Sequence, residues 1–505
     1  MSNVSLKDQP QFLGHPVGLY VLFFTEMWER FSYYGMRAIL TLYLIAEATG
    51  DNPGMGWTEP EALALYGWYT MLVYVASIPG GMIADRLLGQ KRSVMVGGAL
   101  LCAGHITLAF PSDTAFFAGL ALIVAGVGML KPNISTMVGG LYEEGDERRD
   151  KGFSIFYMGI NIGAAAASII VGIVAKEYGW HYGFGLAGIG MIIGQGIYMY
   201  GQKYISHVGN KLDLSSSNES QVDLGELFGR ILKNQMQLAF TAVLAAFSIY
   251  WMIGQDVAYG LLFLFLTAVT AMMMAIYTDL SSVQKDRYVV LLLSFIQVII
   301  FWGAFEQAGG LMNIYTEQKV NKFIFGWELP AAVMQSFNPI YIILFAVPVA
   351  GFWYNWKMKN REASSLFKMA IGLVIMGLGF VFMVGASKQY EATGESALYW
   401  LALAYLFHTI GELCSSPVAL SFITKLAPVK YASLMMGVYF AATGLGNKLA
   451  GYLGESASEL GELTIFSGIT IFCVVFGLLV IAMLKPLKRL THGAEDLQEE
   501  ELVKN

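Results

Sequence analysis

Long apolar runs recur along nearly the whole chain, and they restrict its possible folds more than any other feature. Examples are LLLSFIQVIIFWGAF, IYIILFAVPVAGFW and ITIFCVVFGLLVIAML, and such runs extend from about residue 17 to about residue 485. Roughly 20 apolar residues in a helix span the hydrocarbon core of a bilayer. Lipid cannot satisfy exposed backbone polar groups, so each spanning run must be helical. The sequence therefore predicts an all-α integral membrane protein.

Composition and charge narrow the class further. Hydrophobic residues make up 56% of the chain and charged residues 13%, whereas about a quarter of a soluble protein is charged. The net charge of −6 comes without a basic domain, so nucleic acid is not an expected partner. No cleavable signal peptide is apparent. Cys102, Cys414 and Cys473 lie in separate apolar segments and match no disulfide or metal spacing, so we interpret them as core residues.

The apolar segments follow a pattern of six, two and six, which predicts fourteen transmembrane helices. The first six form an N-terminal bundle over 17–202, behind a cytoplasmic segment over 1–16. A linker over 203–287 carries two additional spanning helices, and a C-terminal bundle over 288–484 precedes a cytoplasmic tail over 485–505. The predicted spans lie at about 17–46, 62–84, 93–110, 114–138, 152–175, 182–202, 237–253, 256–277, 288–309, 331–354, 367–387, 395–424, 432–453 and 462–484.

The distribution of lysine and arginine between the loops predicts the orientation. One set of loops contains DRLLGQKR, ERRDK, KMKNREASSLFK and TKLAPVK, and the alternate set is nearly free of basic residues apart from TEQKVNK. Basic loops stay on the cytoplasmic side of a membrane. Both termini are therefore expected in the cytoplasm.

The first predicted span contains four charged residues. A central charge costs roughly 3 kcal/mol even on the lenient insertion scale, so these side chains must face water or partners on other helices. A purely structural ion-pair cluster is the alternative, but buried ion pairs are poor stabilisers compared with apolar packing. Successive helical residues rotate by about 100°, which places the charges and two tyrosines on one face: Glu26, Glu29, Arg30, Tyr33, Tyr34 and Arg37.

Further charges occur in the middle of later spans, and their signs differ between the halves. The first half adds the cation Lys131, whereas the second half contains the anions Glu306 and Glu412. A cavity between the halves would be positive on one wall and negative on the other. The complementary ligand is a zwitterion with a carboxylate at one end and an ammonium at the other. Aromatic residues can wall the pocket between these poles: Tyr33, Tyr34, Tyr74, Trp302 and Tyr439.

The two halves also share local patterns. Gly126 precedes Pro132 by six residues in the fourth span, and Gly411 precedes Pro417 by six residues in the corresponding span of the second half. Such internal symmetry is typical of duplicated transporters, which bind substrate near the bilayer midplane between their halves.

Several motifs resemble those of the proton-coupled oligopeptide transporter (POT/PTR) family of the major facilitator superfamily, in particular its bacterial di-/tripeptide symporters. The most specific is E-x-x-E-R-F-x-Y-Y-G, which runs from Glu26 to Gly35. FSIFYMGINIGA and KPNIS match further family elements. GGMIADRLLGQKR is similar to a superfamily loop in which Asp85 and Arg86 help to close the cytoplasmic side. The resemblance implies two six-helix bundles, two extra central helices as in bacterial members, and location in the bacterial inner membrane.

The resemblance also implies residue roles. Arg37 and Lys131 would bind the peptide carboxylate, and Glu412 and Asn338 the amino terminus. The residues expected to line the site are Tyr33, Tyr74, Tyr157, Asn161, Gln297, Trp302 and Ser416, with Tyr34 and Tyr439 among the aromatic walls. Proton coupling and gating would involve Glu26, Glu29, Arg30, Arg37, Lys131, Glu306, Asp85 and Arg86.

Two positions depart from the family pattern. Tyr439 stands where many members have tryptophan, which would alter one side-chain pocket. Gly67 stands where animal members have a functional histidine, so coupling here would rely on carboxylates. We hypothesise that an ion pair between Glu306 and Arg37 latches the extracellular side.

These observations predict a proton-driven symporter of dipeptides and tripeptides that works by alternating access, with protons as coupling ions and no other cofactor. A family member for another small solute, such as nitrate or an amino acid, is the nearest alternative, although Glu412 would repel an anion. A membrane-embedded enzyme is a more distant alternative, since no catalytic residues or metal-ligand cluster stand out. A channel is a third alternative, which accumulation above equilibrium would exclude. His408 lies one turn from Glu412 and could either relay protons or pack in the core.

Overall fold

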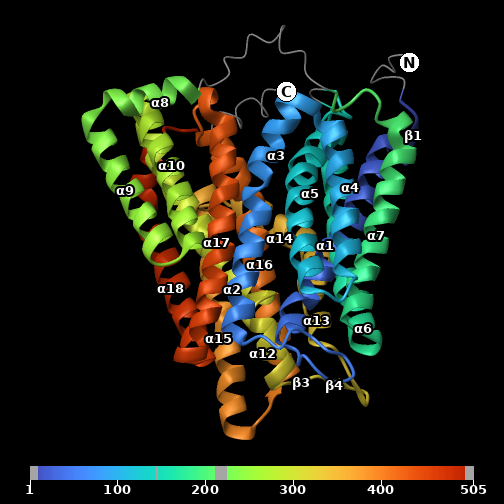
Figure 1. Cartoon of the computed structure of the whole chain (residues 1–505). Coiled ribbons are helices and arrows are strands. Elements are labelled where there is room, and N and C mark those ends of the chain that lie inside the picture. The colour runs from blue at the N-terminus through green and yellow to red at the C-terminus, as the bar shows by residue number, and fades with distance from the viewer. Residues whose placement is uncertain (1–8, 144–145, 211–223, 495–505) are drawn as a thin grey trace. The chain divides into compact units, whose positions relative to one another are not determined.

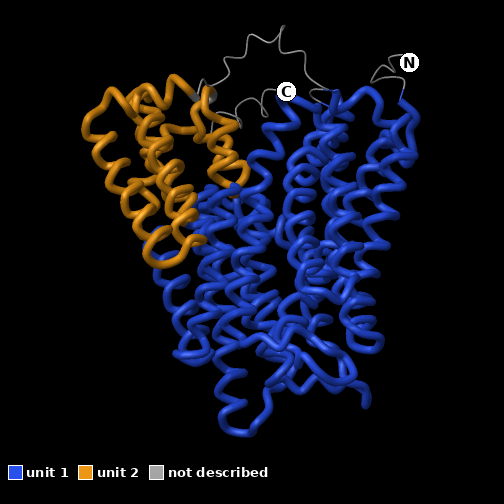
Figure 2. Tube along the Cα trace, in the orientation of Figure 1, with its two compact units in different colours: residues 1–213, 297–418, 440–481 blue, residues 214–296, 419–439, 482–505 orange. Residues whose placement is uncertain are grey.

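The computed structural model describes residues 9–143, 146–210 and 224–494. These residues divide into two compact units (Figure 2). Unit 1 comprises 1–213, 297–418 and 440–481, and unit 2 comprises 214–296, 419–439 and 482–505. This division is by compactness and differs from the predicted bundle boundaries, which stay a prediction.

The chain begins in unit 1 with helices that cover the first six predicted spans (Figure 1). They are α1 (Val17–Ile45), α2 (Glu59–Val75), α3 (Ser77–Ile83), the π-helical turn η2 (Ala84–Leu88), α4 (Gln90–Leu108), α5 (Asp113–Gly139), α6 (Arg148–Tyr178), α7 (Trp180–Tyr200) and the 3-10 turn η3 (Gly201–Tyr204).

Unit 2 contains α8 (Leu224–Lys233), α9 (Gln235–Gly254), α10 (Val257–Asp279) and the short α19 (Leu484–Leu490). It also includes the start of α11 (Ser282–Phe305), the end of α16 (Leu398–Leu426), the turn η5 (Val429–Tyr431) and the start of α17 (Ala432–Leu460). The remaining helices belong to unit 1: η4 (Glu306–Ala308), α12 (Leu311–Lys319), α13 (Ala331–Met334), α14 (Phe337–Met358), α15 (Ser365–Thr393) and α18 (Glu462–Ala482).

Strands are limited to three short pairs among the described residues. β1 (Gln11–Phe12) pairs antiparallel with β2 (His15–Pro16), and β4 (Phe323–Ile324) pairs antiparallel with β5 (Trp327–Glu328). β3 (Val320–Asn321) lies parallel to β6 (Ser396–Ala397). The prediction of an all-α membrane protein is confirmed.

Within the described residues, 11 helical segments are long and apolar enough to span a membrane. The other three predicted spans coincide with α1, α4 and α17, which have 29, 19 and 29 residues. Helix α1 is not among the 11 because of its charges. Any stretch of 18 residues within it includes Glu29, Arg30 and at least one further charged residue. The number fourteen therefore stays a prediction.

One helical segment extends further than the sequence indicated. The span predicted to end near residue 309 continues through η4 into α12 and gives a segment of 38 residues, Ser282–Lys319. A straight helix of this length measures nearly twice the hydrocarbon thickness at about 1.5 Å per residue. The break at η4 places Glu306 at a local change of helical geometry, which is a common location for functional residues.

Matching glycines mark matching helix contacts in the two sequence halves. A Cβ atom on Gly126 of α5 would lie 2.8 Å from the carbonyl oxygen of Gly97 on α4, and one on Gly411 of α16 would lie 2.7 Å from that of Gly372 on α15. Both glycines precede a proline inside their helix by six residues. Small residues let helix backbones approach closely in membranes. These equivalent contacts support the predicted internal duplication.

Candidate functional site

A cavity of about 270 Å³ lies inside unit 1, among α1, α2, α5, α6, α11, η4, α14 and α16. Both sequence halves contribute charged residues to its walls. Most of the predicted site residues line it: Glu26, Arg30, Tyr33, Tyr34, Arg37, Tyr74, Lys131, Tyr157, Asn161, Trp302, Glu306, Asn338, Glu412 and Ser416.

The charges at the start of the E-x-x-E-R motif form a buried cluster on α1. Nε of Arg30 lies 2.8 Å from Oε1 of Glu26 and 2.6 Å from Oε2 of Glu29. Oε2 of Glu26 and Nη2 of Arg30 have no hydrogen-bond partner among the described residues. The cluster thus keeps spare hydrogen-bonding capacity, and two of its residues, Glu26 and Arg30, line the cavity.

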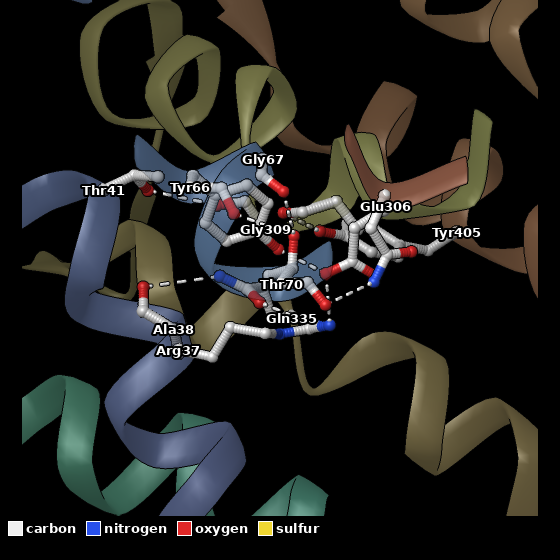
Figure 3. Close-up of polar contacts among 12 residues, drawn as sticks. Arg37, Ala38, Thr41, Tyr66, Gly67, Thr70, Glu306, Gly309, Gln335 and Tyr405 are labelled. Atoms are coloured by element: carbon white, nitrogen blue, oxygen red, sulfur yellow. Dashed lines mark hydrogen bonds and ion pairs between the residues drawn. The ribbon is translucent and has the colours of Figure 1, made fainter. Parts of the chain in front are cut away.

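A second buried ion pair joins the two sequence halves (Figure 3). Nη1 of Arg37 donates to Oε1 of Glu306 at 2.8 Å, and the hydroxyl of Tyr66 donates to the same oxygen at 2.5 Å. Nη2 of Arg37 also lies 3.5 Å from Oε1 of Gln335. The ion pair expected from the sequence is therefore present, and α2 supports it through Tyr66.

Hydrogen bonds continue from this ion pair toward the C-terminal end of α1. The hydroxyl of Thr41 donates to the carbonyl of Gly309 at 3.1 Å, and Nδ2 of Asn313 donates to the carbonyl of Ala38 at 2.9 Å (Figure 3 shows the first of these). Nε2 of Gln335 donates to the carbonyl of Ala38 at 3.3 Å. Together these bonds connect α1 with α12 and the end of α13, beside the cavity-lining residue Gln335.

Two opposite charges in the cavity remain outside these ion pairs. Nζ of Lys131 lies 3.9 Å from the centroid of the Tyr74 ring and makes no ion pair within the described part of the chain. Oε2 of Glu412 accepts a hydrogen bond from Nδ2 of Asn338 at 2.8 Å, and no described cation lies within ion-pair distance. The cavity thus contains one cation and one anion that are available to a ligand.

Aromatic rings surround these charges. The rings of Tyr74 and Trp302 lie 6.5 Å apart between centroids, and Arg37 lies 4.8 Å from the ring centroid of Tyr34. Asn161 donates from Nδ2 to the carbonyl of Tyr157 on its own helix at 2.9 Å. Apolar rings with few polar groups are suited to ligands whose side chains vary.

Some predicted residues lie away from the cavity wall. Glu29 is fully buried behind Arg30, Gln297 is buried with no hydrogen-bond partner for its amide in the described chain, and Asp85 and Arg86 are exposed on η2. Tyr439 belongs to unit 2 and is not among the lining residues. The roles assigned to these residues stay predictions.

The sequence interpretation missed several contributors. Ser135, Gln335 and Tyr405 line the cavity, and Tyr66 holds Glu306. Tyr66 and Tyr74 are two turns apart on one face of α2, so helical spacing could have indicated Tyr66. Ser135 follows Lys131 by four residues on α5, so helical spacing could have indicated it as well.

The environment of His408 and the placement of possible metal ligands bear on the proton relay and the enzyme considered above as alternatives. The ring of His408 lies 4.5 Å from that of Phe380 between centroids, and neither of its nitrogens has a hydrogen-bond partner in the described residues. This environment favours packing over a proton relay. Over 9–143, 146–210 and 224–494, no group of three His, Cys, Asp or Glu side chains is placed to hold a metal ion.

Comparison with known proteins assigns the chain to a family. The sequence profile of PTR2, described as the POT family, matches residues 91–464. The chain belongs to the POT family. It is therefore a multi-pass membrane protein of a transporter family, with the major facilitator type of fold.

POT family relatives match this chain over nearly its whole length. The di-/tripeptide transporter of Lactococcus lactis subsp. cremoris is 34% identical over 500 residues, which cover 97% of this chain and 99% of the relative. A crystal structure of a mutant of the peptide transporter POT in complex with alafosfalin has a TM-score of 0.80 at 34% identity, covering 95% of this chain and 97% of the other. A POT family transporter in complex with 5-aminolevulinic acid has a TM-score of 0.80 at 31% identity, covering 95% and 99%.

Proposed function

We propose that this POT family member is a proton-coupled symporter that imports dipeptides and tripeptides by alternating access. The observation that carries the proposal is the presence of Lys131 and Glu412 in one cavity, each without an ion-pair partner among the described residues. A short peptide carries a carboxylate and an ammonium at its two ends. These ends complement the two available charges, while the aromatic walls tolerate different side chains.

The proposed binding mode assigns one end of the peptide to each charge. Lys131 binds the carboxylate, and Glu412, held by Asn338, binds the ammonium. A hydrogen bond to a charged group contributes about 1.5–3 kcal/mol. Loss of either end therefore weakens binding by roughly 10- to 100-fold.

The coupling step uses the ion pair between Arg37 and Glu306. Protonation of Glu306 removes its negative charge, so Arg37 is released and becomes available to the peptide carboxylate. Breaking this pair removes one connection between α1 and η4. The hydrogen bonds made by Thr41, Asn313 and Gln335 must also break before that end of the cavity can open. A membrane potential of 100 mV supplies about 2.3 kcal/mol for each charge moved, which is enough to drive uphill uptake of a neutral zwitterion.

The proposal also specifies the membrane in which the protein lies and the ion to which transport is coupled. The protein lies in the bacterial inner membrane with both termini in the cytoplasm, in agreement with the basic loops. It uses protons as coupling ions, needs no other cofactor and leaves the peptide intact.

The test is uptake of labelled dialanine into proteoliposomes, with and without an imposed pH gradient. We expect accumulation above equilibrium only with the gradient, and recovery of intact dialanine. Equal uptake with and without the gradient would contradict the coupling, and recovered free alanine would indicate hydrolysis.

A single amino-acid-like zwitterion is a second candidate substrate, because a structural relative is described in complex with 5-aminolevulinic acid. Competition separates the candidates. Unlabelled dipeptides should inhibit uptake of labelled dialanine more strongly than 5-aminolevulinic acid, and nitrate should not inhibit it.

A further inference from the structure

The outer surface of α7 ends in an open groove that is separate from the cavity. The groove is shallow and open, and it lies in unit 1. Ile193, Gly196 and Ile197 line one part, and Tyr200, Lys203 and Tyr204 line the other. It therefore combines an apolar part on a spanning helix with a basic and aromatic part at the end of that helix.

The apolar part faces away from the other helices. Ile189 and Ile192 on the same helix are 55% and 48% exposed, within the spanning segment Trp180–Tyr204. A Cβ atom on Gly196 would meet nothing within 4 Å, whereas one on Gly194 would lie 2.9 Å from Cβ of Trp28. Gly194 thus serves packing against α1, and Gly196 leaves open space toward the lipid. An exposed apolar surface on a spanning helix is covered by acyl chains.

The other part of the groove is formed where α7 gives way to η3. Nζ of Lys203 lies 4.8 Å from the centroid of the Tyr204 ring and makes no ion pair among the described residues. Tyr200 is 89% exposed. Lysine and tyrosine at the end of a spanning helix lie at the level of the lipid headgroups. Lys203 is thus a free cation at the height of the phosphates.

We propose that this groove binds an anionic phospholipid, with its phosphate at Lys203 and an acyl chain over Gly196. The two parts match the two parts of a lipid, because the cation is at the interface and the open apolar space runs along the helix below it. An anionic headgroup is favoured because the site offers one cation and no described carboxylate in ion-pair contact with Lys203 that could receive a headgroup ammonium. One lysine near the membrane surface gives a preference on the order of fivefold.

Native mass spectrometry of the full chain in detergent tests the proposal by titration with phosphatidylglycerol or phosphatidylcholine. We expect about fivefold tighter binding of phosphatidylglycerol, and Lys203→Gln should abolish this preference. Gly196→Leu should reduce the binding of both lipids by filling the groove. Lys388→Gln is the matched control for charge, because Lys388 is likewise an exposed lysine near the end of a long helix, α15. Gly351→Leu is the control for size, because its Cβ would also meet nothing within 4 Å.

Each other outcome overturns the proposal. Equal binding of the two lipids by the unmodified protein contradicts the anionic preference, as does an unchanged preference in Lys203→Gln. An equal loss of binding in Gly351→Leu shows a general effect of added bulk, and a groove occupied by detergent alone excludes a lipid site. Lys203 is exposed, so Lys203→Gln is expected to fold. This variant keeps the test decisive even if Gly196→Leu fails to fold.

Discussion

Charged side chains gather in two regions of this protein, and the two groups differ in burial and pairing. In unit 2, Arg230 of α8 lies 2.9 Å from Oδ1 of Asp279 and 2.6 Å from Oε1 of Glu226. Lys430 lies 3.2 Å from the second oxygen of Asp279, to which the hydroxyl of Tyr431 also donates. In this partly exposed cluster every charge has an opposite partner.

The cavity of unit 1 shows the reverse arrangement. Glu26, Arg30, Arg37, Glu306 and Glu412 are more deeply buried than the charges of unit 2, and Lys131 is partly buried. Yet Lys131 and Glu412 make no ion pairs among the described residues, and Glu26 keeps an oxygen without a partner. Burial of an unpaired charge is destabilising, whereas an exposed ion pair changes stability by only about 0–1 kcal/mol. The proposed function accounts for the cavity charges through a ligand, whereas the charges of unit 2 connect α8 and α10 with the turn η5.

The largest expected effect concerns the two available charges of the cavity. Lys131→Gln and Glu412→Gln should each weaken dialanine uptake by roughly 10- to 100-fold. Neither should lower the thermal unfolding temperature, because Glu412→Gln removes a buried unpaired charge and Lys131→Gln a partly buried one. Uptake measured alongside thermal unfolding in detergent checks this.

Modified peptides serve as the matched controls for these variants. Blocking the amino end of dialanine should impair uptake by the unmodified protein and add little to the defect of Glu412→Gln, and an amidated carboxyl end should behave in the same way with Lys131→Gln. Additive effects would show that these residues do not contact the peptide ends.

The next effect concerns coupling. Glu306→Gln mimics the protonated carboxyl, so it should abolish accumulation driven by a pH gradient while exchange of labelled for unlabelled dialanine continues. Proteoliposome assays of accumulation and exchange separate the two activities. Accumulation at the level of the unmodified protein would reject the proposed proton role of Glu306.

A smaller effect is expected at Asn338, which orients Glu412 through one hydrogen bond and lies 3.1 Å from the hydroxyl of Thr409. Asn338→Ala should raise the KM for dialanine about tenfold, since a hydrogen bond to a charged group contributes about 1.5 kcal/mol or more. Thr409→Val is the comparison variant and should have a weaker effect. An unchanged KM in Asn338→Ala would show that Glu412 needs no such support.

The smallest effect is expected in unit 2. Arg230→Gln should lower stability by about 1 kcal/mol, with a smaller difference at high salt because the cluster is partly exposed. Dialanine uptake at a temperature below unfolding should match that of the unmodified protein. Loss of uptake in a folded Arg230→Gln protein would break the contrast between the two regions and assign unit 2 a part in transport.

Helix positions could be predicted well because the signal for them is local. An apolar run of sufficient length must be helical in lipid, wherever its neighbours lie. The same reasoning placed Glu26, Arg30 and Arg37 on one face, and the cavity contains all three. It failed at residue 309, where the helix resumes as α12 after two glycines that look like an end.

Packing between helices decided what no local pattern could. Arg30 pairs within α1, and Arg37 pairs with Glu306 almost 270 positions further along the chain. Lys131 forms an ion pair with neither Glu306 nor Glu412. Charge and periodicity identify the residues that must avoid lipid, because the cost of desolvation applies to each side chain separately. The choice of partner depends on distances between helices, and those are set only when the whole bundle packs.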